Sequence, residues 1–571
     1  MQRWELLNEL WAIQDQHGYV TNADVTRIAG ALQISTVEVE GVISFYHFFR
    51  RKPVGKFIIY LNDNIIAEMN GRSAVKEAFE KEVGVLWGNT DPLGVFSLFD
   101  TSCIGLNDQE PAALINFYPF TKLTVEKAKH IIRSLRDGIP VEQLADRVKS
   151  EVQGFIGSER NILIRPFAPG KITEQLFQFT PEQVIETILQ SKLTGRGGAN
   201  FPTGRKWALC RQNPGTTKFI VCNADEGEPG AFKDRFLLQA YPGLVIEGMT
   251  AAAYAVGARQ GILYLRAEYR YLQDELEAVL QRYRDQNWLG EHIAGQDFSF
   301  DIRIQLGAGA YVCGEETSLL ESLEGHRGEP RLKIFFPVQK GFQGQPTVVN
   351  NVETFAKAAR ILELGAARFA ELGTVQSRGT RLFSVSGDCQ KPGIYELEWG
   401  VSIKELLAMC EAVDTSFVQV SGPSGSLIPA SQFERRLSIE DVSCNGSFMV
   451  FNKNRDLLQV ISNFIEFFKH ESCGVCTPCR VGNFLLSRQL DKLRCGLVVK
   501  ADLENIQEWG KLMQQASRCG LGQSAPNALL QALQTMPERF TERMTTYAHE
   551  WEKGFDYDKA IAPFDKIQKE E

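Results

Sequence analysis

Three cysteines near the C-terminus are spaced as ligands to a single metal centre. Cys473, Cys476 and Cys479 lie in the segment ESCGVCTPCR (471–480) with two residues between each pair. Two successive C-x2-C spacings bring three thiolates around one point, and thiolates bind both zinc and iron–sulfur clusters. Zinc ribbons usually pair two separated C-x2-C knuckles. The pattern therefore favours a [4Fe-4S] cluster, with zinc as the alternative metal.

The fourth thiolate must come from elsewhere, and two cysteines are candidates. Cys519 lies in SRCGLG and Cys495 in LRCGL. The glycines that follow Cys519 would allow a cluster to approach closely, which favours Cys519. The 12 cysteines among 571 residues are too sparse for a disulfide scaffold, so reduced thiols and a metal site are the better interpretation.

A glycine-rich stretch in the middle of the chain has the composition of a nucleotide site. It reads GRGGANFPTGRKW (195–207), then an apolar run (219–222), then NADEGEPGAFKDR (223–235). Glycines let the backbone approach a bound group, and phosphates are the usual guests. Cations, a flat ring and carboxylates lie between these glycines, a mixture that suits a nucleotide better than a bare anion: Arg196, Arg205, Lys206, Phe201, Asp225, Glu226 and Glu228.

The elements around these glycines differ from those of a Rossmann fingerprint, in which the glycines follow a strand. Here they follow a predicted helix that begins with a capping box at Thr180 and Gln183 and with Pro181 at its first position. A second glycine loop (307–325) follows an alternating strand at 300–306 and precedes an apolar helix. Such a strand-to-helix turn places a ligand at a helix N-terminus, where unpaired amides and the helix dipole favour it.

The bulk composition excludes several classes of protein. A net charge of −8 argues against nucleic acid as the main partner. No apolar run approaches the ~20 residues of a membrane span, and the acidic, amphipathic start MQRWELLNELW is typical of neither a signal nor a transit peptide. We therefore expect a cytoplasmic protein.

The segment CIGLNDQEPAALIN (103–116) resembles the thioredoxin-like [2Fe-2S] subunit of respiratory complex I, where a CxGxCDQAP-like sequence supplies two of the four ligands. In this chain the four ligand positions hold Asn62, Ala67, Cys103 and Asn107. Asparagine and alanine provide no thiolate, and such clusters need four side-chain ligands. We expect no [2Fe-2S] cluster in this domain, and a role in packing or docking instead.

The segments 195–207, 223–235, 307–325 and NNVETF (350–355) resemble the four signatures of the NADH-binding flavoprotein subunit of complex I and its relatives. The resemblance covers residues 180 to 530 and supports Cys519 as the fourth cluster ligand. It implies that FMN is bound by Gly195, Arg196, Gly197, Lys206, Asn223, Asp225, Glu226, Tyr311, Gly314, Glu315, Asn350, Asn351 and Thr354. It implies that NAD contacts Phe201, Glu228, Glu316, Lys333 and Phe336. Relatives usually have two prolines where this chain has Ile334 and Phe335.

The resemblances and the apolar periodicity together predict an α/β multidomain chain. We expect a helical plus thioredoxin-like domain at 1–140, a linker at 141–170 and an FMN- and NAD-binding α/β domain at 171–375. A β-grasp domain at 376–455 and a helical [4Fe-4S] domain at 456–571 follow.

The expected function is electron transfer between NAD(H), FMN and one [4Fe-4S] cluster, with the chemistry performed by the flavin and no catalytic side chain. The order of domains is similar to that in large diaphorase subunits of NAD-reducing [NiFe] hydrogenases. It implies as partners an iron–sulfur diaphorase small subunit and, through it, a hydrogenase small and large subunit pair. Alternatives are the flavoprotein subunit of an NAD-dependent formate dehydrogenase or of NADH:quinone oxidoreductase, and a cofactor-free assembly scaffold.

Overall fold

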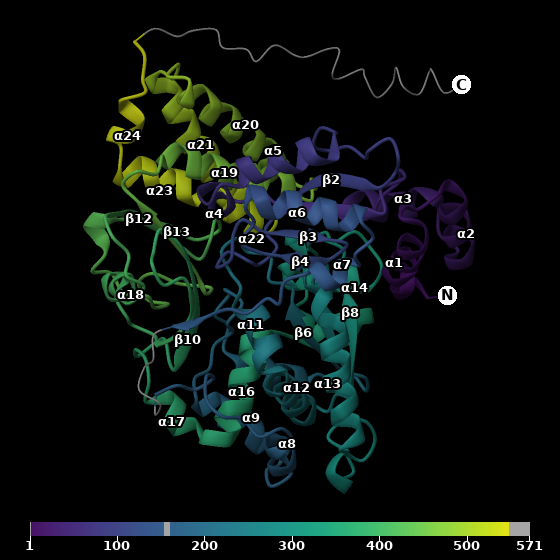
Figure 1. Ribbon diagram of the computed structural model, residues 1–571. Coiled ribbons are helices and arrows are strands. Elements are labelled where there is room, and N and C mark those ends of the chain that lie inside the picture. Colours follow the sequence, from purple (N-terminus) through teal and green to yellow (C-terminus); the bar gives the residue numbers. More distant parts are fainter. Residues whose placement is uncertain (1, 154–159, 547–571) are drawn as a thin grey trace.

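The computed structural model describes residues 2–153 and 160–546 and contains three sheets and a C-terminal helical bundle (Figure 1). The strand orders are β2-β1-β3-β4, β8-β7-β6-β9 and β13-β12-β14-β10-β11-β5. The predicted α/β multidomain fold is confirmed. In the described part of the chain, no single helix is long and apolar enough to cross a membrane, although two helices, Asn22–Leu32 and Thr36–Phe45, pass that test as a pair bent by 117°.

The N-terminal domain places a helical segment ahead of a small mixed sheet. Capping boxes at Thr21 and Ser35 start two of its helices. In the sheet, β1 pairs in parallel with β2 and antiparallel with β3, as expected from the alternating helix and strand pattern. The elements are η1 Arg3–Glu5, α1 Leu6–His17, α2 Asn22–Leu32, α3 Thr36–Phe45, β1 Phe57–Asn62, α4 Ile65–Met69, α5 Arg72–Val83, β2 Phe96–Thr101, β3 Ala113–Ile115, β4 Tyr118–Phe120, α6 Val125–Arg136 and α7 Val141–Leu144.

The central domain is a four-stranded parallel sheet covered by helices. Its strands are β6 Phe219–Ala224, β7 Gln260–Leu265, β8 Asp301–Leu306 and β9 Thr347–Asn351. Its helices are α8 Lys171–Leu176, α9 Pro181–Gln190, α10 Thr203–Gln212, α11 Lys233–Ala240, α12 Pro242–Val256, η2 Ala267–Leu272, α13 Gln273–Asp285, η3 Ile293–Gly295, η4 Tyr311–Gly314, α14 Glu316–Leu323, α15 Pro337–Lys340, η5 Phe342–Gly344, α16 Val352–Leu364 and α17 Ala366–Ala370. The α12–α16 crossing requires a glycine, because a Cβ at Gly248 would lie 2.0 Å from the Phe355 carbonyl oxygen.

The third sheet includes a strand from the predicted linker. Val152–Gln153 (β5) pair with β11 at the sheet edge, so part of the segment 141–170 belongs to this sheet. Residues 154–159 of that segment lie outside the described residues. The other elements are β10 Thr380–Gly387, β11 Gly393–Glu398, α18 Ile403–Met409, β12 Thr415–Val420, β13 Ser426–Pro429, η6 Ala430–Gln432 and β14 Ser447–Asn452.

The C-terminal bundle lies at one end of the molecule, against the N-terminal domain (Figure 1). Its helix α19 is amphipathic and packs Phe464 and Phe468 inward. The helices are α19 Leu457–Glu471, α20 Thr477–Arg494, α21 Lys500–Ala516, α22 Gly520–Ser524, α23 Asn527–Thr535 and α24 Glu538–Thr541. Residues 547–571 of the predicted domain 456–571 lie outside the described residues.

Candidate functional site

The carboxyl ends of β6 and β9 bring together residues predicted to bind the flavin. Asn223 lies at the end of β6 and Asp225 just beyond it, and Asn350 and Asn351 end the neighbouring β9. The chain continues from β6 to β7 and β8 on one side and returns to β9 on the other. The β6–β9 boundary is therefore a switch point of the kind at which open parallel sheets bind ligands.

Two glycine loops cover this switch point. A Cβ at Gly197 would lie 3.3 Å from the Asn351 Cβ, and a Cβ at Gly314 would lie 3.2 Å from the Asp225 carbonyl oxygen. The Asn223 amide donates to the Gly314 carbonyl at 2.9 Å. Backbone therefore approaches both strand ends closely, and a Cβ at either glycine would make a tighter contact than most real Cβ atoms do. This cradle of glycines and amides fits a phosphorylated, planar cofactor such as FMN.

Carboxylates line the same space. Asn223, Asp225 and Glu228 are only partly buried although the strand residues before them are buried, so they border accessible space. The Glu228 carboxylate accepts from the Tyr311 hydroxyl at 2.7 Å and from the Ser424 hydroxyl at 2.8 Å. Burial nevertheless raises the pKa of Glu228 to about 7 and raises that of Asp225 well above its usual range.

Ser424 is a contact that the sequence reasoning missed. It lies in the turn between β12 and β13 of the third sheet, far from Glu228 along the chain. The only local signal is the turn sequence GPSGS (422–426), which does not indicate what it contacts.

Lys206 lies on α10 beside the strand ends. Its ammonium group donates to the Val349 carbonyl at 2.9 Å and pairs with Glu316 at 3.1 Å. Glu315 accepts from the Thr317 and Ser318 amides and so caps α14. Glu315 is one of the residues implied for FMN, but its carboxylate already accepts hydrogen bonds from amides at the start of α14.

Two other implied flavin residues direct their side chains elsewhere. Arg196 is fully buried, and its guanidinium donates to the Thr194 and Arg378 carbonyls; its backbone amide bonds the Thr354 hydroxyl at 2.8 Å. The Glu226 carboxylate accepts from the Asp234 and Arg235 amides at the start of α11. Each of these side chains is used to hold the loop, and the carbonyls of Arg196 and Glu226 likewise accept from Arg381 and Arg266.

Two of the residues implied for NAD, Phe201 and Phe336, are 40% and 61% exposed, and the neighbours of Phe336 in the sequence form an apolar patch: Leu332 and Ile334 are 63% and 73% exposed. Such a patch suits a flat aromatic group. Ile334 and Phe335, which stand where relatives have prolines, belong to it, and the Lys340 ammonium lies 4.1 Å from the Phe335 ring centroid.

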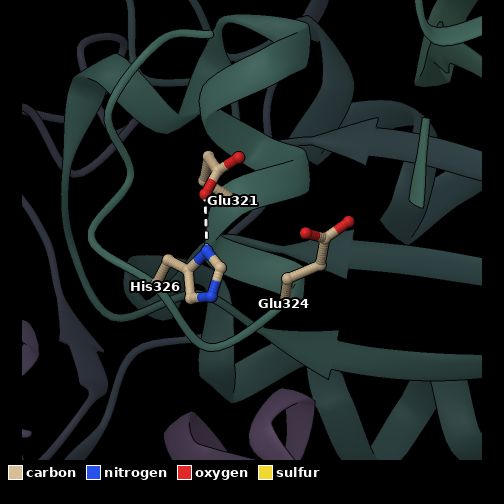
Figure 2. Close-up of side chains that lie close together, drawn as sticks. All are labelled: Glu321, Glu324 and His326. Carbon is tan, nitrogen blue, oxygen red and sulfur yellow. Dashed lines mark hydrogen bonds and ion pairs between the residues drawn. The ribbon is translucent and has the colours of Figure 1, made fainter. Parts of the chain in front are cut away.

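Beside this surface, Glu321, Glu324 and His326 form a group whose ligand atoms lie within 4.8 Å of one another (Figure 2). His326 Nδ1 lies 2.6 Å from Glu321. Arg331 pairs with Glu321 at 2.5 Å and with Glu324 at 2.8 Å. Because the guanidinium already pairs with both carboxylates, we interpret the group as an ion-pair network that fixes the start of the segment RLKIFFP (331–337).

The predicted cluster cysteines surround the junction of α19, α20 and α22. Cys479 lies in the first turn of α20, and Cys519 precedes α22. A Cβ at Gly522 would lie 2.8 Å from the Cys479 Cβ, so α22 packs directly on this ligand loop. Cys495 is exposed and follows the far end of α20, 16 residues from Cys479 in sequence, which corresponds to roughly 24 Å along a helix.

The donor set fits an iron–sulfur cluster better than zinc. Zinc–sulfur bonds of about 2.3 Å in a tetrahedron require thiolate sulfurs roughly 3.8 Å apart. Among the described residues, the one group of three or more metal-ligand atoms within 4.8 Å of one another is the Glu321 group, so no three cysteine sulfurs lie that close together. Burial raises the pKa of Cys479 to about 12, so its thiolate needs the charge of a metal.

One carboxylate connects this cluster loop to the two other domains. Glu471 ends α19, two residues before Cys473. It accepts from the Ser102 hydroxyl of the N-terminal domain and from the Tyr311 amide of the central domain, the latter at 2.8 Å. The cluster loop, the second glycine loop and the N-terminal domain are thereby held at one point.

The four former ligand positions of the N-terminal domain do not fit a [2Fe-2S] cluster. Cys103 is the one thiol among them, and it donates to Asn107 Oδ1 at 3.0 Å. The same loop docks on the central domain: Arg266 donates to the Cys103 carbonyl at 2.7 Å and Arg235 to the Gly105 carbonyl at 2.9 Å. The backbone carbonyls between two of the former ligand positions, 103 and 107, therefore bind arginines of the central domain.

Three sequence families match the chain in the order of its domains. They are the thioredoxin-like [2Fe-2S] ferredoxin (residues 1–136), the Nuo51 FMN-binding domain (188–360) and the NADH-ubiquinone oxidoreductase-F iron-sulfur binding region (459–543). Fold, site and families together define a flavin- and iron–sulfur-dependent oxidoreductase subunit of the complex I flavoprotein class. The name of the first family is in tension with the ligand loss described above.

Relatives that match the chain over its full length identify a narrower family within this class. The chain is 47% identical over 581 residues to the NAD-reducing hydrogenase HoxS subunit alpha of Cupriavidus necator, covering 100% of this chain and 96% of that one. It is 38% identical to the NADP-reducing hydrogenase subunit HndC of Solidesulfovibrio fructosivorans, over 68% and 79% of the two chains. A chain in the crystal structure of NAD+-reducing [NiFe]-hydrogenase in the H2-reduced state superposes with a TM-score of 0.89 at 36% identity, over 98% of this chain and 96% of that one.

The chain belongs to the family of NAD-reducing hydrogenase HoxS alpha subunits. The family resemblance and the enzyme class predicted from the sequence, an NAD-dependent flavin and iron–sulfur oxidoreductase, are confirmed.

Proposed function

We propose that this chain is the diaphorase subunit that exchanges electrons with NAD(H) in an NAD-reducing hydrogenase, whose overall reaction is H2 + NAD+ → NADH + H+. The observation that carries the proposal is that one chain contains both a glycine-lined site at the strand ends and a four-cysteine site. The first has the donor groups that suit FMN, and the second has the thiols that suit a [4Fe-4S] cluster. The full-length similarity to HoxS alpha supports this choice over a formate dehydrogenase or quinone oxidoreductase subunit.

FMN, when bound, would supply the exchange between two-electron and one-electron carriers. The chain itself binds and orients. The Gly197 and Gly314 backbone admits the planar ring and phosphate, and Lys206 adds positive charge. Asn223, Asn350 and Asn351 shape the strand ends: Asn223 donates to the Gly314 carbonyl, Asn350 accepts from the Trp207 ring NH, and Asn351 caps α16. Phe201 and Phe336 provide apolar surface for NAD. Cys473, Cys476, Cys479 and Cys519 would hold the [4Fe-4S] cluster.

Glu228 has a further role in this proposal. With a pKa of about 7, its carboxyl group is about half protonated at neutral pH, while Tyr311 and Ser424 hold it in place. It is able to hold or release a proton at its carboxylate oxygens beside the nucleotide surface.

We propose an iron–sulfur diaphorase small subunit as the direct partner and, through it, a [NiFe] hydrogenase subunit pair, all in the cytoplasm. Val475, Val481 and Phe484 are 36%, 40% and 53% exposed around the cluster cysteines. An apolar rim beside a redox centre suits a partner that accepts electrons there. The net charge of −8 does not favour nucleic acid.

The proposal includes one iron–sulfur cluster and no [2Fe-2S] cluster. The argument is the donor set: one thiol among the four positions 62, 67, 103 and 107, against the four side-chain ligands that such a cluster needs. Membership of a family named for a [2Fe-2S] ferredoxin reflects the fold of residues 1–136.

The test is NADH-dependent reduction of ferricyanide and of a viologen by the purified chain, together with its visible spectrum. We expect a flavin absorbance band and turnover with both acceptors. A cofactor-free assembly scaffold would give neither. Copurification with a nickel-containing partner would support the hydrogenase assignment, and a molybdenum-containing partner would point to a formate dehydrogenase.

Replacing Lys206 by alanine should weaken FMN binding at least about tenfold, because a charge-assisted hydrogen bond contributes ~1.5–3 kcal/mol. The measurement is flavin retained per chain after gel filtration, with a fluorescence titration of apoprotein for the affinity. The matched control is Arg205→Ala: Arg205 is the preceding cation on α10 and its side chain is exposed. Full FMN occupancy in Lys206→Ala would contradict the role of this lysine.

A further inference from the structure

The main chain of Arg196, in the first glycine loop, is held at both its amide and its carbonyl. The amide donates to the Thr354 hydroxyl at 2.8 Å, and the carbonyl accepts from Arg381 Nη2 at 2.7 Å. Arg196, Thr354 and Arg381 are each 0% exposed, so both hydrogen bonds are shielded from solvent. The bond from the Arg381 guanidinium is charge-assisted and therefore stronger than a bond between neutral groups.

The orientation of the Arg196 carbonyl also determines that of the next amide. The Arg196–Gly197 peptide bond is trans, and in a planar trans peptide unit the C=O and N–H groups point in opposite directions. Because the carbonyl points toward the buried Arg381, the Gly197 N–H points away from it. Gly197 and Gly198 are exposed, in contrast to Arg196. The Gly197 amide is therefore a donor on the open side of the loop that is implied for FMN.

Arg381 comes from the third sheet and not from the central domain. It lies on β10, which pairs with β11 on one side and with β14 on the other. Its guanidinium lies 5.6 Å from the Trp399 ring centroid and 3.8 Å from the Glu353 carboxylate. The contact between the two segments is reciprocal, because the Arg196 guanidinium donates to the Arg378 carbonyl just before β10. The third domain therefore helps to set the conformation of the first glycine loop.

A simpler role for Arg381 would be to neutralise the buried Glu353. Lys357 and Lys233 lie closer to that carboxylate, at 3.1 and 3.3 Å, than Arg381 does at 3.8 Å. The 2.7 Å hydrogen bond of Arg381 goes instead to the Arg196 carbonyl. Charge balance alone therefore does not explain where the guanidinium is directed.

We propose that Arg381 is a positioning residue for flavin binding: it fixes the peptide unit between Arg196 and Gly197 so that the Gly197 amide donates to an oxygen of FMN. The inference rests on the proposed function, because it takes FMN as the ligand of this loop. Without the bond from Arg381 the peptide unit would be able to turn. The loop would then be competent to bind for only a fraction of the time, and the apparent affinity would fall by that fraction.

The first test is the Kd of the apoprotein for FMN, measured by flavin fluorescence. We expect Arg381→Met to bind FMN about tenfold more weakly than the wild type. Arg381→Lys, which keeps a charged donor, should bind within about threefold of the wild type. Equal FMN affinity in the wild type and Arg381→Met would overturn the proposal, as would the lack of any recovery in Arg381→Lys. If wild-type apoprotein did not bind FMN, the proposed function would fail instead.

The matched control is Lys357→Met. Lys357 is fully buried and pairs with the same Glu353, but its hydrogen bonds within the described residues go to Thr380 and not to the glycine loop. Both variants lose one buried cation beside Glu353, so a general loss of stability would weaken FMN binding in both. We expect Lys357→Met to keep the wild-type FMN affinity and about four iron atoms per chain. Equal weakening of FMN binding in the two variants would overturn the role of Arg381.

Riboflavin identifies which oxygen the Gly197 amide contacts, because it has the ring system of FMN but no phosphate. If the amide donates to the phosphate, Arg381→Met should weaken the binding of FMN and leave that of riboflavin unchanged. If the amide donates to a ring carbonyl, the variant should weaken both by the same factor. Either pattern supports the positioning role, and unchanged binding of both ligands contradicts it.

Discussion

Replacing Cys479 by serine is expected to remove the [4Fe-4S] cluster while flavin remains bound. The side chain lies in the first turn of α20, with α22 packed on it, and a serine hydroxyl is a much weaker ligand for iron than the thiolate it replaces. Iron should fall from about four per chain to near zero, and the cluster signal in electron paramagnetic resonance should disappear. NADH should still bleach the flavin, whereas H2-driven NAD+ reduction by the assembled complex should fall to background.

The matched control is Cys495→Ser, which changes an exposed thiol beyond the opposite end of α20 and should leave iron content and activity unchanged. The same pair of proteins decides the state of the N-terminal domain. If Cys479→Ser retained about two iron atoms and a [2Fe-2S] spectrum, the single-cluster proposal would be wrong. If Cys495→Ser lost its iron while a Cys519→Ser variant kept it, the fourth cluster ligand would be Cys495 and not Cys519.

Replacing Glu353 by glutamine is expected to destabilise the protein by about 3–5 kcal/mol, because it leaves buried cations without their counter-charge. Glu353 is fully buried between Lys357 at 3.1 Å and Lys233 at 3.3 Å, and it accepts from the Leu382 amide at 3.1 Å. Although burial opposes ionisation, Arg381, Lys357 and Lys233 hold the Glu353 pKa far below its usual range. The measurement is urea unfolding of wild type and variant.

The sign of the pH dependence follows from that lowered pKa. The stability that Glu353 contributes is fully present above the ordinary glutamate pKa near 4.5 and is lost as the pH falls toward the lower folded value. The control Glu77→Gln removes an exposed pair with Lys81, in which both side chains are more than half exposed, and should change stability by less than about 0.5 kcal/mol. A Glu353→Gln variant as stable as this control would contradict the account. Adding Lys357→Met should recover part of the loss.

Short-range patterns predicted much of the candidate site. The glycine loops, Asn223 and the Asn350–Asn351 pair lie where strand ends meet, because parallel strands present their carboxyl ends at one edge. The direction of individual side chains was not predictable in the same way. Glu226 turns to cap α11, and Arg196 enters a junction with Arg378 and Thr380, partners that lie far away in the sequence.

The fourth cluster ligand illustrates the same limit. Cys495 and Cys519 sit in nearly identical local sequences, RCGL in both cases. What separates them is the length of α20, which places Cys495 a full helix away from Cys479. The pairing of Val152 with Ile394 was also beyond local reasoning, because a two-residue strand has no periodicity of its own.

The position of Glu471 has a consequence for the rate of the redox chemistry. Its carboxylate joins Ser102, Tyr311 and the loop that begins at Cys473. Electron tunnelling slows steeply as donor and acceptor move apart. The contacts of Glu471 limit how far the cluster loop, the second glycine loop and the N-terminal domain can move relative to one another. Loosening the N-terminal domain would therefore slow electron transfer between the flavin and cluster sites.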